Sequence, residues 1–229
     1  MKLVLLPGMD GTGKLFADFV NALPTPYDTA VVAYSTLNTQ TYEQLEDVVR
    51  QTCPLAEPFI LVAESYSAPI AIKYSASHPK NLKGLVLCAG FASSPLQGWR
   101  RLAARFLVPI LFLMKPPAFA VRHWLVGPSA SASLVRAVQG AISSVRPSVL
   151  AARLRSILSC DLRDDLRNIK VPVLYMKAQQ DRLVRSSCSE EIARLIPTIR
   201  IVTLEGPHLI LQRHPESAAK IVTEFEQTL

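Results

Sequence analysis

Short apolar segments alternate with amphipathic segments along most of this chain. Each apolar segment has five or six residues, is rich in Val, Leu and Ile, and shows no period-two alternation of apolar and polar residues. Parallel strands that are covered on both faces have this pattern. The predicted strands are Lys2–Leu6, Ala30–Tyr34, Phe59–Ala63, Gly84–Cys88, Val171–Met176 and Arg200–Leu204.

The amphipathic segments have the apolar spacing of helices. They are Leu15–Leu23, Tyr42–Cys53, Pro69–His78, Ser189–Leu195 and Pro215–Gln227. Regular alternation of strands and helices predicts an α/β fold with an open, doubly wound parallel sheet of about six strands. The chain has 229 residues, a length that one such domain often reaches.

One connection is much longer than the others. About 80 residues separate the strand ending at Cys88 from the strand starting at Val171. This interval contains several prolines and no predicted strand, and its apolar residues have helical spacing. The apolar stripes are Leu134, Val138 and Ile142, and Leu150, Leu154, Ile157 and Leu158. We therefore expect a helical lid at residues 93–161, inserted in a core formed by residues 1–92 and 162–229.

The sequence predicts a cytoplasmic protein without a cofactor. Met1 and Lys2 run directly into an apolar strand, with no leader-like apolar region and cleavage site. The longest apolar stretch, Phe106–Met114, has nine residues, whereas a membrane-spanning helix needs about 20. Four widely spaced cysteines do not fit a disulfide scaffold or a zinc site, so we expect reduced thiols and no metal.

Charge is distributed unevenly along the chain. The formal net charge is +7, yet residues 66–160 contain no Asp or Glu and twelve Lys or Arg. A basic middle third of this kind suggests an acidic partner. Nucleic acid is disfavoured as that partner because the basic segment lacks interleaved exposed aromatic residues and any known nucleic-acid-binding module.

Residues 59–73, FILVAESYSAPIAIK, predict a buried strand, a tight turn and a helix. Ser65 lies in the turn, with the small residues Ala63 and Ser67 two positions before and after it. A serine in such a turn holds its hydroxyl above the sheet edge, where it can act as a nucleophile. The usual pattern has glycines at both flanking positions, and the alternative interpretation is a helix capped by Ser65 or Ser67.

The loop after the first strand, PGMDGTG, contains three of the nine glycines in the chain. A phosphate-binding loop is one interpretation, but Leu15 stands where that motif needs a Ser or Thr for Mg²⁺. The other interpretation is half of an oxyanion hole, in which the Met9 backbone N–H stabilises developing negative charge.

Two further polar residues follow predicted strands directly. Asp181 comes after the strand of Val171–Met176, and His208 comes after the strand of Arg200–Leu204. Ligand-facing groups in an open α/β sheet lie at the carboxyl ends of strands, where Ser65 is also expected. Glu64, next to Ser65, is expected to hydrogen-bond nearby backbone rather than act as a base.

Four phrases, LLPGMDGTG, LVAESYSAPIAI, NIKVPVLYMKAQQDRLV and LEGPHLILQRHPESAAKIV, together resemble the α/β-hydrolase family over nearly the whole chain. The resemblance implies Ser65 as nucleophile, His208 as its base and Asp181 as the group that orients the imidazole. It also implies an oxyanion hole formed by the backbone N–H groups of Met9 and Tyr66. Compared with the family, the chain lacks the usual first two strands.

The same resemblance predicts acyl transfer to water through an acyl-enzyme, with a small acyl ester as substrate. A basic lid with apolar stripes is similar to that of esterases that demethylate pimeloyl groups on acyl carrier protein during biotin synthesis. The candidate carrier-docking residues are Arg100, Arg101, Arg105, Arg136, Arg146, Arg153 and Arg155.

Three alternatives remain open. The lid could contact anionic lipid, which would make the protein a lipase or lysophospholipase. The arginines could merely solubilise the lid of a general short-chain carboxylesterase or thioesterase. The chain could also be a non-catalytic binding protein on the same fold, although none of Ser65, Asp181 and His208 is replaced.

Overall fold

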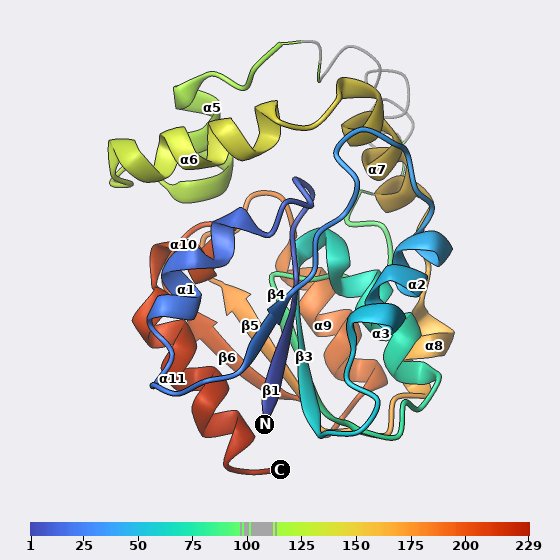
Figure 1. Cartoon of the computed structure of the whole chain (residues 1–229). Coiled ribbons are helices and arrows are strands. Elements are labelled where there is room, and N and C mark those ends of the chain that lie inside the picture. The colour runs from blue at the N-terminus through green and yellow to red at the C-terminus, as the bar shows by residue number, and fades with distance from the viewer. Residues whose placement is uncertain (97, 99–100, 102–111, 113) are drawn as a thin grey trace.

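The computed structural model describes residues 1–96, 98, 101, 112 and 114–229 (Figure 1). Two of the predicted docking residues, Arg100 and Arg105, lie outside the described residues.

The centre of the molecule is a six-stranded sheet in which every neighbouring pair of strands is parallel. The strand order is β2-β1-β3-β4-β5-β6, which confirms the predicted open parallel sheet. The strands are β1 (Lys2–Leu6), β2 (Thr29–Val31), β3 (Phe59–Glu64), β4 (Leu82–Cys88), β5 (Val173–Ala178) and β6 (Arg200–Leu204).

Helices cover both faces of this sheet (Figure 1). One face is covered by the 3₁₀ turn η1 (Lys14–Phe16), α1 (Ala17–Asn21), α10 (Ile210–Arg213) and α11 (Pro215–Glu226). The other face is covered by α2 (Tyr42–Thr52), α3 (Ala68–Ala76), α8 (Arg163–Arg167) and α9 (Ser186–Leu195). The helices α8 and α10 have five and four residues, too few for a helical period to be recognised in the sequence.

Successive residues of β1 enter opposite apolar cores. Leu3 and Leu5 pack in the core beneath α11, and Val4 and Leu6 pack in the core beneath α2 and α3. All four side chains are fully buried. Burial on both faces explains why the central strands show continuous apolar runs instead of alternation.

The expectation that every strand is buried is wrong for β2 and β6. The three residues of β2 are half-buried or exposed, and in β6 Arg200, Ile201 and Thr203 are exposed. These strands form the two edges of the sheet, so each has a hydrogen-bonded neighbour on one side alone.

Several helices of the long connection between β4 and β5 lie above the carboxyl ends of the strands (Figure 1). They are α5 (Ala118–Val121), the π-helical turn η3 (Arg122–Val126), α6 (Ala132–Ser143) and α7 (Pro147–Ser159). Ser93 and Asp161 form an isolated antiparallel bridge where the chain leaves and re-enters the core. None of the helices in the described residues combines the length and the apolar character that crossing a bilayer requires.

Candidate active site

Ser65 lies in a strained turn at the carboxyl end of β3. The strand ends at Glu64, and a 3₁₀ turn, η2 (Ser65–Ser67), leads directly into α3. Ser65 has a φ angle of 48°, in the left-handed region that residues other than glycine rarely adopt. Such strain is characteristic of functional turns, because it persists only where the surrounding structure imposes it.

Ser67 has a structural role in this turn. Its side chain is fully buried, and its Oγ donates a hydrogen bond of 2.5 Å to the Pro7 carbonyl. The same Oγ lies 2.8 Å from the Tyr34 hydroxyl. A hydroxyl at a position where the usual motif has glycine therefore connects the Ser65 turn to the loop that follows β1.

Three side chains from three loops form one hydrogen-bonded chain. His208 Nε2 lies 2.8 Å from Ser65 Oγ, and His208 Nδ1 lies 2.7 Å from Asp181 Oδ2. The other Asp181 oxygen, Oδ1, accepts hydrogen bonds from the backbone N–H groups of Leu183 and Val184. Asp181 is thereby fixed through one oxygen and presents the other to the imidazole.

The surroundings of His208 favour its protonated form. The His208 side chain is 4% exposed and that of Asp181 is 5% exposed, so water screens their interaction weakly. Burial lowers the pKa of His208, but the charge and hydrogen bond of Asp181, together with the charge of Glu64, outweigh it and raise the pKa above its ordinary value. This arrangement can accept a proton from Ser65 and stabilise the resulting imidazolium.

The loop after β1 is held by buried side chains on both sides of Met9. The buried Glu64 carboxylate lies beside Gly8, where an added Cβ atom would be 3.4 Å from Oε2, and the Gly8 carbonyl accepts a hydrogen bond from the Gly11 N–H. Gly11 has a φ angle of 69°, which glycine adopts without strain. Among the described residues, no hydrogen bond uses the Met9 backbone N–H.

The prediction that Arg153 docks a carrier protein is wrong, because this side chain is buried. It is 2% exposed, and its guanidinium donates to the carbonyls of Met9, Asp10 and Ser35. A side chain enclosed in this way cannot reach a partner protein. The other predicted docking residues that the structure describes are exposed: Arg101, Arg136, Arg146 and Arg155.

Glu64 is a second residue whose surroundings the sequence did not reveal. It is 2% exposed, and its Oε1 has no hydrogen-bond partner within the described part of the chain. Its Oε2 lies 3.4 Å from Gln212 Nε2. Burial raises the pKa of Glu64 to about 7; the charge of Asp10 adds to the shift, and the charge of His208 opposes it.

We expect Glu64→Gln to increase stability at pH 8. A raised carboxyl pKa means that the native state binds more protons than the unfolded state between pH 4.5 and about 7, so stability falls as pH rises through this window. Glutamine removes that penalty, which corresponds to at most about 3.5 kcal/mol at about 1.4 kcal/mol per pKa unit. Urea unfolding should show the gain at pH 8 and almost none at pH 4.5.

The same variant should shift the acidic limb of the pH–rate profile to lower pH, because the Glu64 charge helps to raise the pKa of His208. The carboxyl groups of Asp10 and Asp181 also contribute charge here. The pKa obtained from the profile therefore belongs to the set of interacting groups and not to His208 alone. This account of Glu64 would be contradicted if Glu64→Gln were less stable than wild type at pH 8 and the acidic limb of its pH–rate profile had not moved.

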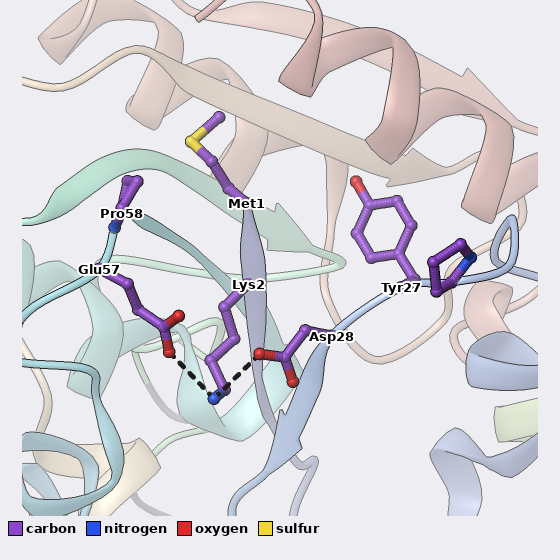
Figure 2. Close-up of a pocket in the computed structure, with 7 residues that line it drawn as sticks. Met1, Lys2, Tyr27, Asp28, Glu57 and Pro58 are labelled. Atoms are coloured by element: carbon purple, nitrogen blue, oxygen red, sulfur yellow. Dashed lines mark hydrogen bonds and ion pairs between the residues drawn. The ribbon is translucent and has the colours of Figure 1, made fainter.

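A separate cavity of about 330 Å³ lies at the amino ends of β1 and β3 (Figure 2). Lys2 occupies it with two ion pairs, 3.1 Å from Asp28 Oδ2 and 3.2 Å from Glu57 Oε1 (Figure 2). Open α/β sheets bind ligands at the carboxyl ends of their strands, so this cavity is at the wrong end of the sheet for the Ser65 site.

A parallel sheet with a strained serine turn after a central strand, and with histidine and aspartate on later loops, defines an α/β protein of the hydrolase class. The model of the alpha/beta hydrolase family matches residues 3–221. The chain belongs to this family, and hydrolysis is the reaction class that the assignment supports.

Solved structures show the same fold. A thermophilic esterase from Thermogutta terrifontis superimposes with a TM-score of 0.85, at 19% identity, over 100% of this chain and 90% of that one. The enol-lactonase from Burkholderia xenovorans has a TM-score of 0.77 and 20% identity, over 99% of this chain and 91% of that one.

One curated protein has a local sequence similarity. A putative carbamate hydrolase, RutD, from a Caulobacter species is 31% identical over 80 residues. The match covers 34% of this chain and 30% of that protein, so this similarity concerns a part of each chain.

Proposed function

We propose that this protein is a serine carboxylic-ester hydrolase in which Ser65, His208 and Asp181 act as a catalytic triad. The observation that carries the proposal is the continuous hydrogen-bonded chain from Ser65 Oγ through both nitrogens of His208 to Asp181 Oδ2. The strained backbone of Ser65 adds support, because it holds the hydroxyl where the imidazole can reach it.

In the acylation step, His208 Nε2 takes the proton of Ser65 while Oγ forms a bond to the carbonyl carbon of the ester. The carbonyl π electrons move to oxygen and produce a tetrahedral oxyanion. When the carbonyl re-forms, the bond to the alkoxy oxygen breaks, and the departing alcohol takes the proton from His208. Water then repeats the sequence on the acyl-enzyme, which releases the carboxylic acid and restores Ser65.

The oxyanion in this scheme is stabilised by the backbone N–H groups of Met9 and Tyr66. The absence of another acceptor for the Met9 N–H among the described residues supports its part in this role. Tyr66 directly follows the nucleophile, the position from which an α/β hydrolase takes its second donor.

Apolar side chains near the site favour an aliphatic acyl group. Met9 packs against the buried cluster of Val145, Val149 and Leu150 in the long connection, and Leu209, next to His208, packs in an apolar cluster with Val126 and Val138. We propose as specific substrate a pimeloyl methyl ester on acyl carrier protein, an intermediate of biotin synthesis. The exposed arginines of the lid would dock the acidic carrier.

The test compares hydrolysis of the pimeloyl methyl ester on the carrier protein with hydrolysis of the same acyl group as a free methyl ester, at low and high salt. We expect at least a tenfold preference for the carrier-bound ester, about 1.4 kcal/mol, that disappears at high salt. The double variant Arg136→Gln and Arg155→Gln should reduce the preference. The control Lys83→Gln, exposed near the amino end of β4, should retain it.

Other outcomes have definite meanings. Equal rates on both esters would contradict carrier docking and indicate a general short-chain carboxylesterase or thioesterase. Activity that appears only with anionic vesicles would indicate a lipase or lysophospholipase. Activity on a carbamate with none on either ester would contradict the ester assignment, in line with the local similarity to the carbamate hydrolase.

A further inference from the structure

Arg153 extends from α7 into the protein interior and binds the loop that follows β1. Its Nη1 donates two hydrogen bonds of 2.8 Å, one to the Met9 carbonyl and one to the Asp10 carbonyl. Its Nη2 donates one of 2.9 Å to the Ser35 carbonyl. These acceptors lie between 118 and 144 residues away in the sequence.

The guanidinium is buried without a carboxylate bonded to it. Among the described residues, Arg153 forms no salt bridge. The backbone carbonyls are its hydrogen-bond partners, and its Cζ lies 5.8 Å from the ring centre of Tyr34 and 5.9 Å from that of Tyr66. Burying a charge is costly unless hydrogen bonds and aromatic faces replace water, so this site is specific for a planar guanidinium.

The loop is shaped to receive this guanidinium. A Cβ atom on Gly11 would lie 2.5 Å from Arg153 Nη1, so a larger residue there would displace the guanidinium from this position. The Ser67 bond to the Pro7 carbonyl and the Arg153 bonds to the carbonyls of Met9 and Asp10 together fix residues 7–10. The peptide groups on both sides of the Met9 N–H are therefore held by buried side chains.

We propose that Arg153 is a positioning residue that holds the β1 loop in the conformation in which the Met9 N–H stabilises the oxyanion. The inference rests on the proposed ester hydrolysis and adds a residue that acts through the loop. Because Arg153 is carried by α7, it also makes the oxyanion-binding loop depend on the position of the long connection between β4 and β5.

Loss of this anchor should affect the transition state more than the ground state. A correctly aimed oxyanion-hole donor contributes roughly 10²-fold or more to kcat. A loop that samples other conformations still binds the neutral ester but stabilises the oxyanion poorly. We therefore expect Arg153→Lys and Arg153→Met to lower kcat by about 30- to 100-fold, with KM changed by less than about threefold.

The experiment measures kcat, KM and the Ki of two inhibitors for these variants. One inhibitor is an alkyl trifluoromethyl ketone, which forms a tetrahedral oxyanion adduct with a serine; the other is the carboxylate product. We expect ketone affinity to fall by the same factor as kcat, and product affinity to stay nearly constant. The control is Arg122→Lys, because Arg122 also donates to two carbonyls, those of Pro128 and Ala130, without contacting the β1 loop.

Each outcome supports or overturns the proposal. If Arg153→Met fails to fold, Arg153→Lys provides the test, because lysine keeps the positive charge and the aliphatic chain but lacks the planar guanidinium. Its folding is checked by circular dichroism. A folded Arg153→Lys with wild-type kcat and ketone affinity would overturn the positioning role. A raised KM with unchanged kcat would overturn it in favour of substrate binding. A wild type that neither hydrolyses esters nor binds the ketone would overturn the proposed function itself.

Discussion

Ser65→Ala is expected to lower kcat/KM for ester hydrolysis by about 10⁵-fold or more, to the level of residual oxyanion-hole catalysis. Without the hydroxyl no acyl-enzyme forms, and water would have to attack the ester directly. The imidazole of His208, 2.8 Å from Ser65 Oγ, would lose the group that it deprotonates. The fold should persist, because alanine occupies the same turn with one atom fewer.

The measurement combines steady-state kinetics with mass spectrometry of the protein after treatment with a fluorophosphonate. Wild type should carry one phosphonyl group on Ser65, and Ser65→Ala should carry none. Ser77→Ala is the matched control, because Ser77 is exposed at the far end of α3 and its hydroxyl donates to the local Tyr74 carbonyl. Labelling at another serine, or a Ser65→Ala enzyme with activity near wild type, would contradict the mechanism.

Stability provides a second readout at the same position. Ser65 holds a φ angle of 48°, which costs about 1 to 2 kcal/mol for a residue with a Cβ atom. Ser65→Gly should therefore unfold at a higher temperature than Ser65→Ala, although both lack the nucleophile. Equal unfolding temperatures would show that the turn carries no such strain.

Asp181→Asn is expected to lower kcat by about 10⁴-fold while leaving the fold intact. The asparagine oxygen can keep the hydrogen bonds from Leu183 and Val184, so the NH₂ group turns toward His208 Nδ1. That nitrogen must then accept a hydrogen bond, which places the imidazole proton on Nε2, facing Ser65. An imidazole in this tautomer cannot take the serine proton.

The pH dependence separates this effect from simple loss of structure. Asp181 raises the pKa of His208 through its charge and hydrogen bond, so the residual activity of Asp181→Asn should have its acidic limb at lower pH. Asp164→Asn is the control, because Asp164 is exposed and pairs with Arg167 at the surface. A folded Asp181→Asn with kcat within tenfold of wild type would exclude Asp181 as the orienting group.

Local patterns were sufficient for most of the fold. The predicted β1 and β6 match the observed bounds, and α2, α3 and α11 differ from prediction by one or two residues at their ends. A buried strand or an amphipathic helix shows its character within about ten consecutive residues, which is why these elements can be predicted. The open parallel sheet follows from their alternation.

Local patterns gave less information about the environment of each element. The strands β2 and β6 have apolar sequences similar to the central strands, yet they form the sheet edges and are partly exposed. The position of a strand within a sheet depends on which elements pair with it, and strand order does not follow chain order here. The apolar sequences of β2 and β6 therefore predicted more burial than these two strands have.

Ser65, Asp181 and His208 were selected from the sequence because each lies in the loop after a predicted strand, at the edge where parallel strands end, and because the resemblance to the α/β-hydrolase family implied their roles. The roles of Arg153 and Glu64 were decided by the tertiary structure alone. Arg153 has the sequence context of its exposed neighbour Arg155, and only the carbonyls of Met9 and Asp10, more than 140 residues away, make it an interior residue. Whether a charged side chain faces solvent or is buried depends on the partners that replace its water, and here those partners come from distant parts of the chain.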